Sequence, residues 1–259
     1  MLPDFHMIIH DLPAEDCVII PVGDVHLGAK EHCRKAWDEF CARVLDRPNT
    51  YLIIGGDMMN NALKTSVSNV YEELLSPSEQ KKQLVTQLTP LKDRILCGIQ
   101  GNHERRTSKD ADQDPLYDIF CKMGIEDRYR SNAAFMNLRL GNVKKNHATP
   151  CYYFAVVHGA GSSIYTVSAA TRAERFGMAI DGIDCLVSFH THKPINAPIS
   201  KLVVDRTHNR VDMQSWRLVV GSSWLDYSAY AIQKLLTPTA RVHQEIRLKA
   251  KSRELTVIQ

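Results

Sequence analysis

The chain has 259 residues, of which 44% are hydrophobic and 24% charged, a composition typical of a globular protein with a large buried core. Its formal net charge of +3 is too small to indicate nucleic-acid binding by itself. We expect no membrane-spanning helix, because no stretch approaches about 18 consecutive apolar residues. The seven cysteines contain no C-x-x-C pair, which argues against a thiolate zinc site and against a disulfide framework.

The first half of the chain alternates short apolar runs with helical patterns. The runs 17–22, 51–54 and 94–99 are short and rich in β-branched residues, which predicts buried strands. Helices are expected over about 31–46, from the capping box at Ser76-Pro77-Ser78-Glu79 to about Leu88, and over 115–123. This strand–helix–strand order favours parallel βαβ units.

The second half of the chain is richer in strands. Short strands are expected at 134–140, 151–157, 185–188, 201–205 and 211–220, with two more after Val242. One helix is expected over about 164–176, and turns at Gly141-Asn142 and His208-Asn209. We find no linker or repeat, so residues 1–259 are expected to form one α/β domain of two packed sheets with helices outside.

The N-terminal segment lacks the basic start and long apolar core of a signal peptide. An odd number of cysteines without regular spacing favours reduced thiols. We therefore expect a cytoplasmic location and no membrane partner.

Five predicted strands are each followed by side chains that can bind a metal ion. These side chains are Asp24 and His26, Asp57 and Asn60, Asn102 and His103, His158, and His190 and His192. Since ligand sites in open α/β sheets lie at the carboxyl ends of strands, residues far apart in sequence can meet there. In extended backbone, the spacing of two between Asp24 and His26, and between His190 and His192, would direct both members of each pair to one side.

The donor types agree with a metal site that acts on a phosphate ester. Oxygen donors combined with imidazole suit Mn²⁺, Fe, Zn²⁺ or Mg²⁺ better than copper or a thiolate cluster. Two metals roughly 3.5–4 Å apart would neutralise a phosphate and activate water. A single histidine of this kind is more often structural, but five motifs in order favour the metal site.

The set of motifs from Gly23 to His192, in the order G-D-x-H, G-D-x-x-N, G-N-H-E, H-G and H-T-H, resembles the calcineurin-like metallophosphoesterases. The resemblance implies a four-layer αββα sandwich of two mixed sheets flanked by helices. It also implies two divalent metals, Mn²⁺ first, with Fe, Zn²⁺, Mg²⁺ or Ni²⁺ as alternatives. By position, one metal would be held by Asp24, His26 and His192, and the other by Asn102, His158 and His190, with Asp57 bridging them.

The resemblance further implies a catalytic role for His103, as proton donor to the leaving oxygen or as a clamp on the phosphate. A hydroxide that bridges the metals would attack phosphorus in line. Asn60 occupies the position of the aspartate that orients this histidine in the family's protein phosphatases, and could hydrogen-bond His103 as a neutral partner. Arg105 and Arg106 could bind a substrate phosphate or a nucleic-acid backbone; the alternatives are a solvated helix start or a salt bridge with Asp110 or Asp112.

Two departures from the family pattern affect the expected substrate. Phe189 stands where the last motif usually has glycine, which changes backbone freedom but no ligand. The protein phosphatases resemble G-D-x-x-D-R-G in the second motif, whereas this chain has Asn60-Asn61-Ala62 and lacks the arginine. The form D-V-H-L-G at 24–28 is closer to the nuclease and phosphodiesterase branch, and the run 76–105 resembles phosphoesterases of bacteriophages and prophages.

We therefore expect a two-metal phosphodiesterase or nuclease that acts on nucleic acid or a nucleotide in a bacterial or phage-infected cytoplasm, with DNA or RNA as candidate partners. A phosphomonoesterase acting on a protein or small molecule is the alternative. A non-catalytic structural subunit is disfavoured because every ligand position is filled. These patterns do not fix the oligomeric state, and a homo-oligomer is one alternative. The aromatic segment 224–230 could stack a base, form a dimer contact or pack in the core.

Overall fold

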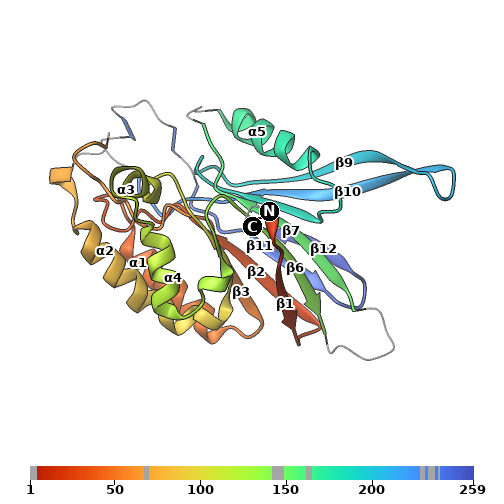
Figure 1. Cartoon of the computed structure of the whole chain (residues 1–259), viewed down its shortest axis with the longest axis horizontal. Helices are drawn as coiled ribbons and strands as arrows, with labels where there is room; N and C mark the ends of the chain where they lie inside the picture. Colours follow the sequence, from red (N-terminus) through yellow and green to blue (C-terminus); the bar gives the residue numbers. More distant parts are fainter. Residues whose placement is uncertain are drawn as a thin grey trace.

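The computed structural model describes residues 5–66, 70–141, 149–161, 165–227, 231–232, 237–238 and 240–259. Two six-stranded mixed sheets pack face to face with helices outside them (Figure 1). This is the expected α/β sandwich of four layers. In this described part of the chain, we find no helix that combines the length and the apolar character needed to cross a membrane.

The first sheet, called the β3 sheet, has the strand order β12-β11-β2-β3-β4-β5. Its strands are β2 (Asp16–Val22), β3 (Thr50–Ile54), β4 (Ile95–Ile99), β5 (Tyr129–Arg130), β11 (Glu245–Lys249) and β12 (Glu254–Ile258). The four strands from β2 to β5 run parallel, while β11 pairs antiparallel with both β2 and β12. The βαβ units expected from the sequence are therefore present.

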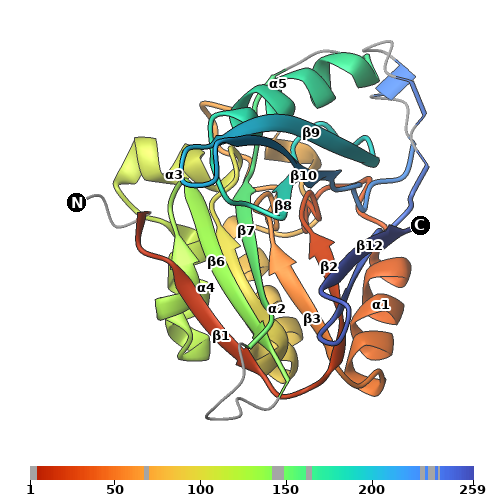
Figure 2. The ribbon, with the colours of Figure 1, turned by 90° about the vertical axis from the view of Figure 1, so that its right-hand side faces the viewer.

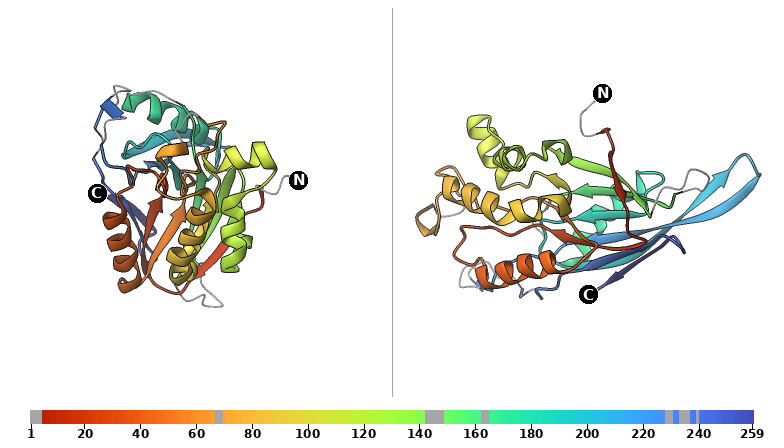
Figure 3. Two further views of the ribbon diagram at one scale, coloured as in Figure 1. Left: turned by 90° about the vertical axis from the view of Figure 1, so that its left-hand side faces the viewer. Right: turned by 90° about the horizontal axis from the view of Figure 1, so that it is seen from below.

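The second sheet, called the β7 sheet, has the strand order β1-β6-β7-β8-β10-β9. Its strands are β1 (Ile8–Leu12), β6 (Ala133–Leu140), β7 (Cys151–Val157), β8 (Cys185–Ser188), β9 (Ile195–Asp205) and β10 (Arg210–Val220). Strand β9 is longer than the expected 201–205, because its Pro198 lies on an edge strand, where a missing N–H is tolerated. The β9–β10 hairpin projects beyond the rest of the molecule (Figure 3).

Helices cover the outer faces of both sheets, as Figure 2 shows. Helices α1 (Arg34–Asp46), α2 (Pro77–Leu88) and α4 (Pro115–Met123) pack on the β3 sheet, and α5 (Thr166–Met178) packs on the β7 sheet. Short helices complete the chain: α3 (Glu104–Ala111), η2 (Val70–Glu72), η3 (Thr89–Arg94) and η4 (Glu126–Arg128). The expected capping box at Ser76 and Glu79 is confirmed.

Alternation along the strands divides the apolar side chains between two cores. In β3, Ile53 points into the core between the sheets, whereas Leu52 and Ile54 pack under α1, α2 and α4. Because both faces are covered, the strand is apolar throughout, as is typical of parallel sheets. This burial holds the strand ends, and the loops that follow them, in fixed positions.

Some expectations need correction or lie outside the described residues. Strand β1 was not expected, and helix α3 was expected only as a helix start at Arg105 and Arg106, one of the alternatives for these residues. Trp224 is buried against Trp37, Phe40 and His243, so this part of the aromatic segment packs in the core. Tyr230, and with it the end of that segment, lies outside the described residues, as do Asn142 in an expected turn and the first expected helix residue, 164.

Candidate metal centre

The loops that follow β2, β3, β4, β7 and β8 lie together at one end of the sandwich. Strands β2, β3 and β4 are parallel neighbours in one sheet, and β7 and β8 are parallel neighbours in the other, so their carboxyl ends share an edge. The main-chain N–H of His190 donates to Asp24 Oδ2 at 2.9 Å, which joins the two sheets at this end. All seven residues expected as metal ligands lie in these loops.

One group of donors combines Asp24, His26 and His192. The Nε2 atoms of the two histidines are 3.3 Å apart, and His192 Nε2 lies 3.4 Å from Asp24 Oδ1. Two imidazole nitrogens held by one ion, at bonds of about 2.1 Å, lie about 3.0–3.4 Å apart. The spacing therefore fits donors that converge on a single ion.

A second group combines Asp57, His158 and His190, with Asn102 beside them. Asn102 Oδ1 lies 3.0 Å from His158 Nε2 and 2.7 Å from His190 Nδ1. The other ring nitrogen of His158 contacts Gly55 O at 2.7 Å, which orients the ring so that Nε2 faces the site.

The carboxylate of Asp57 lies between the two groups. Its Oδ2 atom is 3.3 Å from His158 Nε2 and 4.0 Å from His26 Nε2. Burial alone would raise the pKa of Asp57, but the facing histidines, His158 first, hold that pKa below its usual range. A carboxylate that stays ionised while almost fully buried is suited to contact two cations.

Buried polar atoms without partners test whether these residues fit metal ions. Asp24 Oδ1 and His26 Nδ1 are buried and accept or donate no hydrogen bond among the described residues. Leaving such groups unpaired costs about 1–3 kcal/mol each. A cation would satisfy the carboxylate oxygen, so the donor set fits a divalent metal pair of the kind expected from the sequence.

The backbone of the ligand loops differs from the extended form expected from the spacing of two. Asp24, His26, Asp57, His190 and His192 all have φ between 49° and 74°, in the left-handed region. Non-glycine residues adopt this region rarely, and such strain concentrates at functional sites. The members of each pair do face the same site, but through tight left-handed turns and not through a strand.

His103 lies at the edge of the site, at the start of α3. Its Nδ1 lies 2.7 Å from the main-chain O of Asn60, its Nε2 lies 3.8 Å from Asp57 Oδ2, and its ring packs against His26. Burial lowers the pKa of His103, and the charge of Asp57 opposes that shift. The expected side-chain contact from Asn60 is not formed, because the Asn60 amide donates to Glu73 and only its main chain meets His103.

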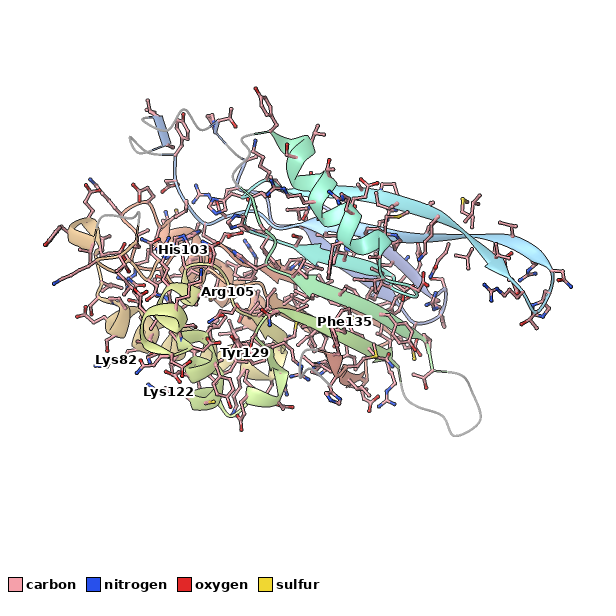
Figure 4. The ribbon with its side chains drawn as sticks, turned by 45° about the horizontal axis from the view of Figure 1, so that its top comes forward. Lys82, His103, Arg105, Lys122, Tyr129 and Phe135 are labelled. Atoms are coloured by element: carbon pink, nitrogen blue, oxygen red, sulfur yellow. The ribbon has the colours of Figure 1, made fainter. Side chains whose placement is uncertain are left out.

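The two arginines after His103 have different surroundings. Arg106 places Nη2 3.0 Å from His103 Nε2 and donates through Nη1 to Asn60 O. Arg105 donates to the main-chain O of Ser131 and to Asn132 Oδ1, not to Asp110 or Asp112. Figure 4 labels His103 and Arg105, which lie near one another where α3 begins.

Arg105 lines a groove of about 640 Å³ that adjoins the second donor group. This α3–α5 groove is bounded by side chains of both helices and has Asn102 and His190 at one end. Its lining contributes three cations, Arg105, Lys109 and Arg172, and none of the described lining residues is an aspartate or glutamate.

Glu104 is a positioning residue that the sequence reasoning missed. Its fully buried carboxylate accepts main-chain N–H groups of Asp57, Met59 and Gly101, at 2.8, 3.0 and 3.1 Å. Burial, reinforced by the charge of Asp57, raises the pKa of Glu104 to about 7. Glu104 therefore ties the second motif to the third. The signal in the sequence was Glu104 itself, the last residue of the G-N-H-E motif.

Phe189 anchors the loop that carries His190 and His192. Its ring is fully buried between three strand-end glycines: a Cβ atom would lie 2.5 Å from the ring at Gly23, 2.1 Å at Gly55 and 2.6 Å at Gly221. The three glycines, which have no side chain, leave the space that the Phe189 ring occupies.

Comparisons with known proteins give structural matches only. No family model and no curated protein matches the chain. A conserved uncharacterized protein of Streptococcus pneumoniae, described as a predicted phosphoesterase, is 9% identical with a TM-score of 0.37, over 90% of this chain and 84% of that chain. A metallophosphoesterase from Sphaerobacter thermophilus is 10% identical with a TM-score of 0.41, over 93% and 87%.

A third match is GAP50, the anchor in the inner membrane complex of Plasmodium, which is 12% identical with a TM-score of 0.43 over 94% of this chain and 88% of that one. At such identities and TM-scores, none of these likenesses assigns a role to this chain.

Proposed function

We propose that the protein is a two-metal phosphoester hydrolase of the calcineurin-like metallophosphoesterase superfamily, formed by residues 1–259 as one domain. The observation that carries this proposal is the position of Asp57 Oδ2, which faces His158 on one side and His26 on the other. Asp24, His26 and His192 would hold one ion, Asn102, His158 and His190 the other, and Asp57 both. When bound, two such ions neutralise phosphate charge and lower the pKa of a water nucleophile.

The surrounding side chains have separate roles in this proposal. His103 donates its Nδ1 proton to Asn60 O, so Nε2 faces the site and accepts a hydrogen bond from Arg106. When Arg106 turns to the phosphate, Nε2 can take up a proton and give it to the leaving oxygen. Arg106 lies beside that nitrogen and supplies the cation that the second motif lacks. Its planar guanidinium can bind two oxygens of a phosphate.

We propose a phosphodiester, in nucleic acid or a nucleotide, as the substrate. Support comes from the cationic groove beside the second donor group, which offers room for chain on one side of the scissile phosphate. A phosphomonoesterase is the second candidate, because Arg106 gives His103 a full positive neighbour that suits a dianionic phosphate. We propose Mn²⁺ as the working metal, and a cytoplasmic location because all seven cysteines are free thiols.

The proposal is tested by metal content and hydrolysis in wild type, Asp57→Asn and the matched surface variant Asp46→Asn. Wild type and Asp46→Asn should bind two Mn²⁺ per chain and cleave bis-p-nitrophenyl phosphate faster than p-nitrophenyl phosphate. Asp57→Asn should lose metal and fall to the background rate. An Asp57→Asn protein that keeps most of its turnover would refute the bridging role, and faster monoester cleavage by wild type would favour the second candidate.

A further inference from the structure

The α3–α5 groove extends from the second donor group along the surface between two helices. Asn102 and His190 lie at its inner end, Arg105 and Lys109 project from α3, and Arg172 projects from α5. Its volume of about 640 Å³ lies within the roughly 300–1,000 Å³ of sites that bury small molecules. The groove is therefore large enough for more than the reacting phosphate.

The charge of the groove indicates an anionic occupant. Within the described part of the chain, the hydrogen bonds of Arg105 and Arg172 go to neutral oxygens: Arg105 donates to Ser131 O and Asn132 Oδ1, and Arg172 donates to Ala160 O at 3.1 Å. Lys109 is exposed at the same groove. The described lining of the groove thus has several cations and no carboxylate. These cations repel one another, and their combined field raises the local concentration of anions.

One aromatic side chain gives the groove a second chemical character. Phe176 lies on α5 four residues after Arg172, which places both on one face of the helix. The residue is 40% exposed and belongs to the groove lining. Stacking a nucleobase on this ring removes apolar surface from water, which is favourable, and every base has a flat face that can stack in this way. Phosphate-binding cations beside an aromatic platform are the combination found in sites for single-stranded nucleic acid.

We propose that the α3–α5 groove binds a nucleotide of single-stranded nucleic acid next to the scissile phosphate, with the neighbouring phosphate at Arg105, Lys109 and Arg172 and the base on Phe176. This inference rests on the proposed phosphodiesterase function and specifies its substrate class. Side chains of α3 and α5 line the groove, and Asn102 and His190 connect it to the metal centre.

The test is binding of fluorescein-labelled oligo(dT) and oligo(U) of equal length, by anisotropy over a salt series in EDTA, which stops metal-dependent hydrolysis. The variant R105Q/K109Q/R172Q is compared with R175Q/K122Q, which removes cations of α5 and α4 outside the groove. At about 0.7 per neutralised phosphate, loss of the one phosphate held by these three cations should reduce the salt slope by about 0.7 and weaken binding roughly fivefold at 0.1 M salt. The control should bind as wild type does.

Phe176→Ala separates stacking from charge. It should weaken oligonucleotide binding roughly tenfold while leaving the salt slope, and binding of inorganic polyphosphate, unchanged. Equal losses for polyphosphate would overturn the base contact, and wild-type binding by the triple variant would overturn the groove. Tighter binding of oligo(dT) would identify the occupant as single-stranded DNA, and tighter binding of oligo(U) would identify it as single-stranded RNA.

Hydrolysis of bis-p-nitrophenyl phosphate by wild type with Mn²⁺ keeps the two proposals distinguishable. If wild type hydrolyses this substrate but the triple variant binds oligonucleotides as wild type does, only the proposal for the groove is overturned. Groove-dependent binding without hydrolysis would overturn the enzymatic proposal and support a nucleic-acid-binding role.

Discussion

A methyl group added at Gly55 would collide with the ring of Phe189. An alanine Cβ there would lie 2.1 Å from Cε2, 2.2 Å from Cδ2 and 2.4 Å from Cζ. The ring cannot move aside, because Gly23 and Gly221 already bring main chain close to its other edge. We expect Gly55→Ala to lower the free energy of unfolding by about 1–3 kcal/mol, the usual cost of overpacking.

The same substitution should behave differently when the ring is absent. Phe189→Ala alone should cost about 3–5 kcal/mol through lost burial and a cavity. In that background, the methyl group that Gly55→Ala adds enters vacated space and should contribute about 0.8 kcal/mol of stability. The two substitutions are therefore expected to interact by about 2–4 kcal/mol, which combines the relieved clash with the regained contact.

Urea unfolding in EDTA, followed by tryptophan fluorescence, measures this interaction without a contribution from bound metal. Gly177→Ala is the matched control, because its Cβ would lie 2.3 Å from Trp216 Cη2 and away from Phe189, so its cost should be the same in both backgrounds. Phe189→Leu provides a milder background if Phe189→Ala does not fold. A cost of Gly55→Ala that differs by less than about 0.5 kcal/mol between backgrounds would refute the proposed contact.

Two further predictions concern histidines with different roles. His103→Ala should keep both metals while slowing turnover by about 10²–10⁴-fold, and loss of metal, measured by mass spectrometry, would make His103 a ligand. Burial, aided by Arg43 and Arg241, lowers the pKa of His243 from 6.5 to about 4 in the folded protein. The unfolded chain therefore binds a proton at a higher pH than the folded protein does, so the contribution of neutral His243 to the free energy of unfolding is complete only above pH 6.5. That contribution, at most about 3 kcal/mol, should vanish as pH falls from 6.5 through 4. His243→Phe, which keeps the stacking on Trp224, should flatten this part of the stability profile, and an unchanged profile would contradict the assignment.

The features predictable from sequence depend on neighbouring residues in the chain. The bounds expected for α4 match the structure because Asp114 caps the helix, Pro115 begins it and Gly124 ends it in a left-handed conformation. The seven candidate ligands could be placed together because each follows an apolar strand, and parallel strands share a carboxyl edge.

The features that escaped prediction depend on contacts across the chain. Helix α3 has no apolar stripe, so periodicity gave no signal; what holds it is Glu104, whose partners include the N–H of Asp57. Strand β1 is a short edge strand defined by its pairing with β6, more than 120 residues later. The contact of Arg106 with His103, like that of Asn60 with Glu73, follows from side-chain directions that no local pattern encodes.

The left-handed backbone of the ligand loops has a consequence for engineering this protein. A non-glycine residue held at positive φ costs on the order of 1–3 kcal/mol, and five candidate ligands share this conformation. Glycine at position 192 would relax that cost and remove a candidate ligand at the same time, whereas at position 24 it would also remove the carboxylate that accepts from His190 N–H. A thermostability screen without selection for activity would thus enrich glycine in these loops, and thermostable variants chosen by that route would be the least able to bind metal.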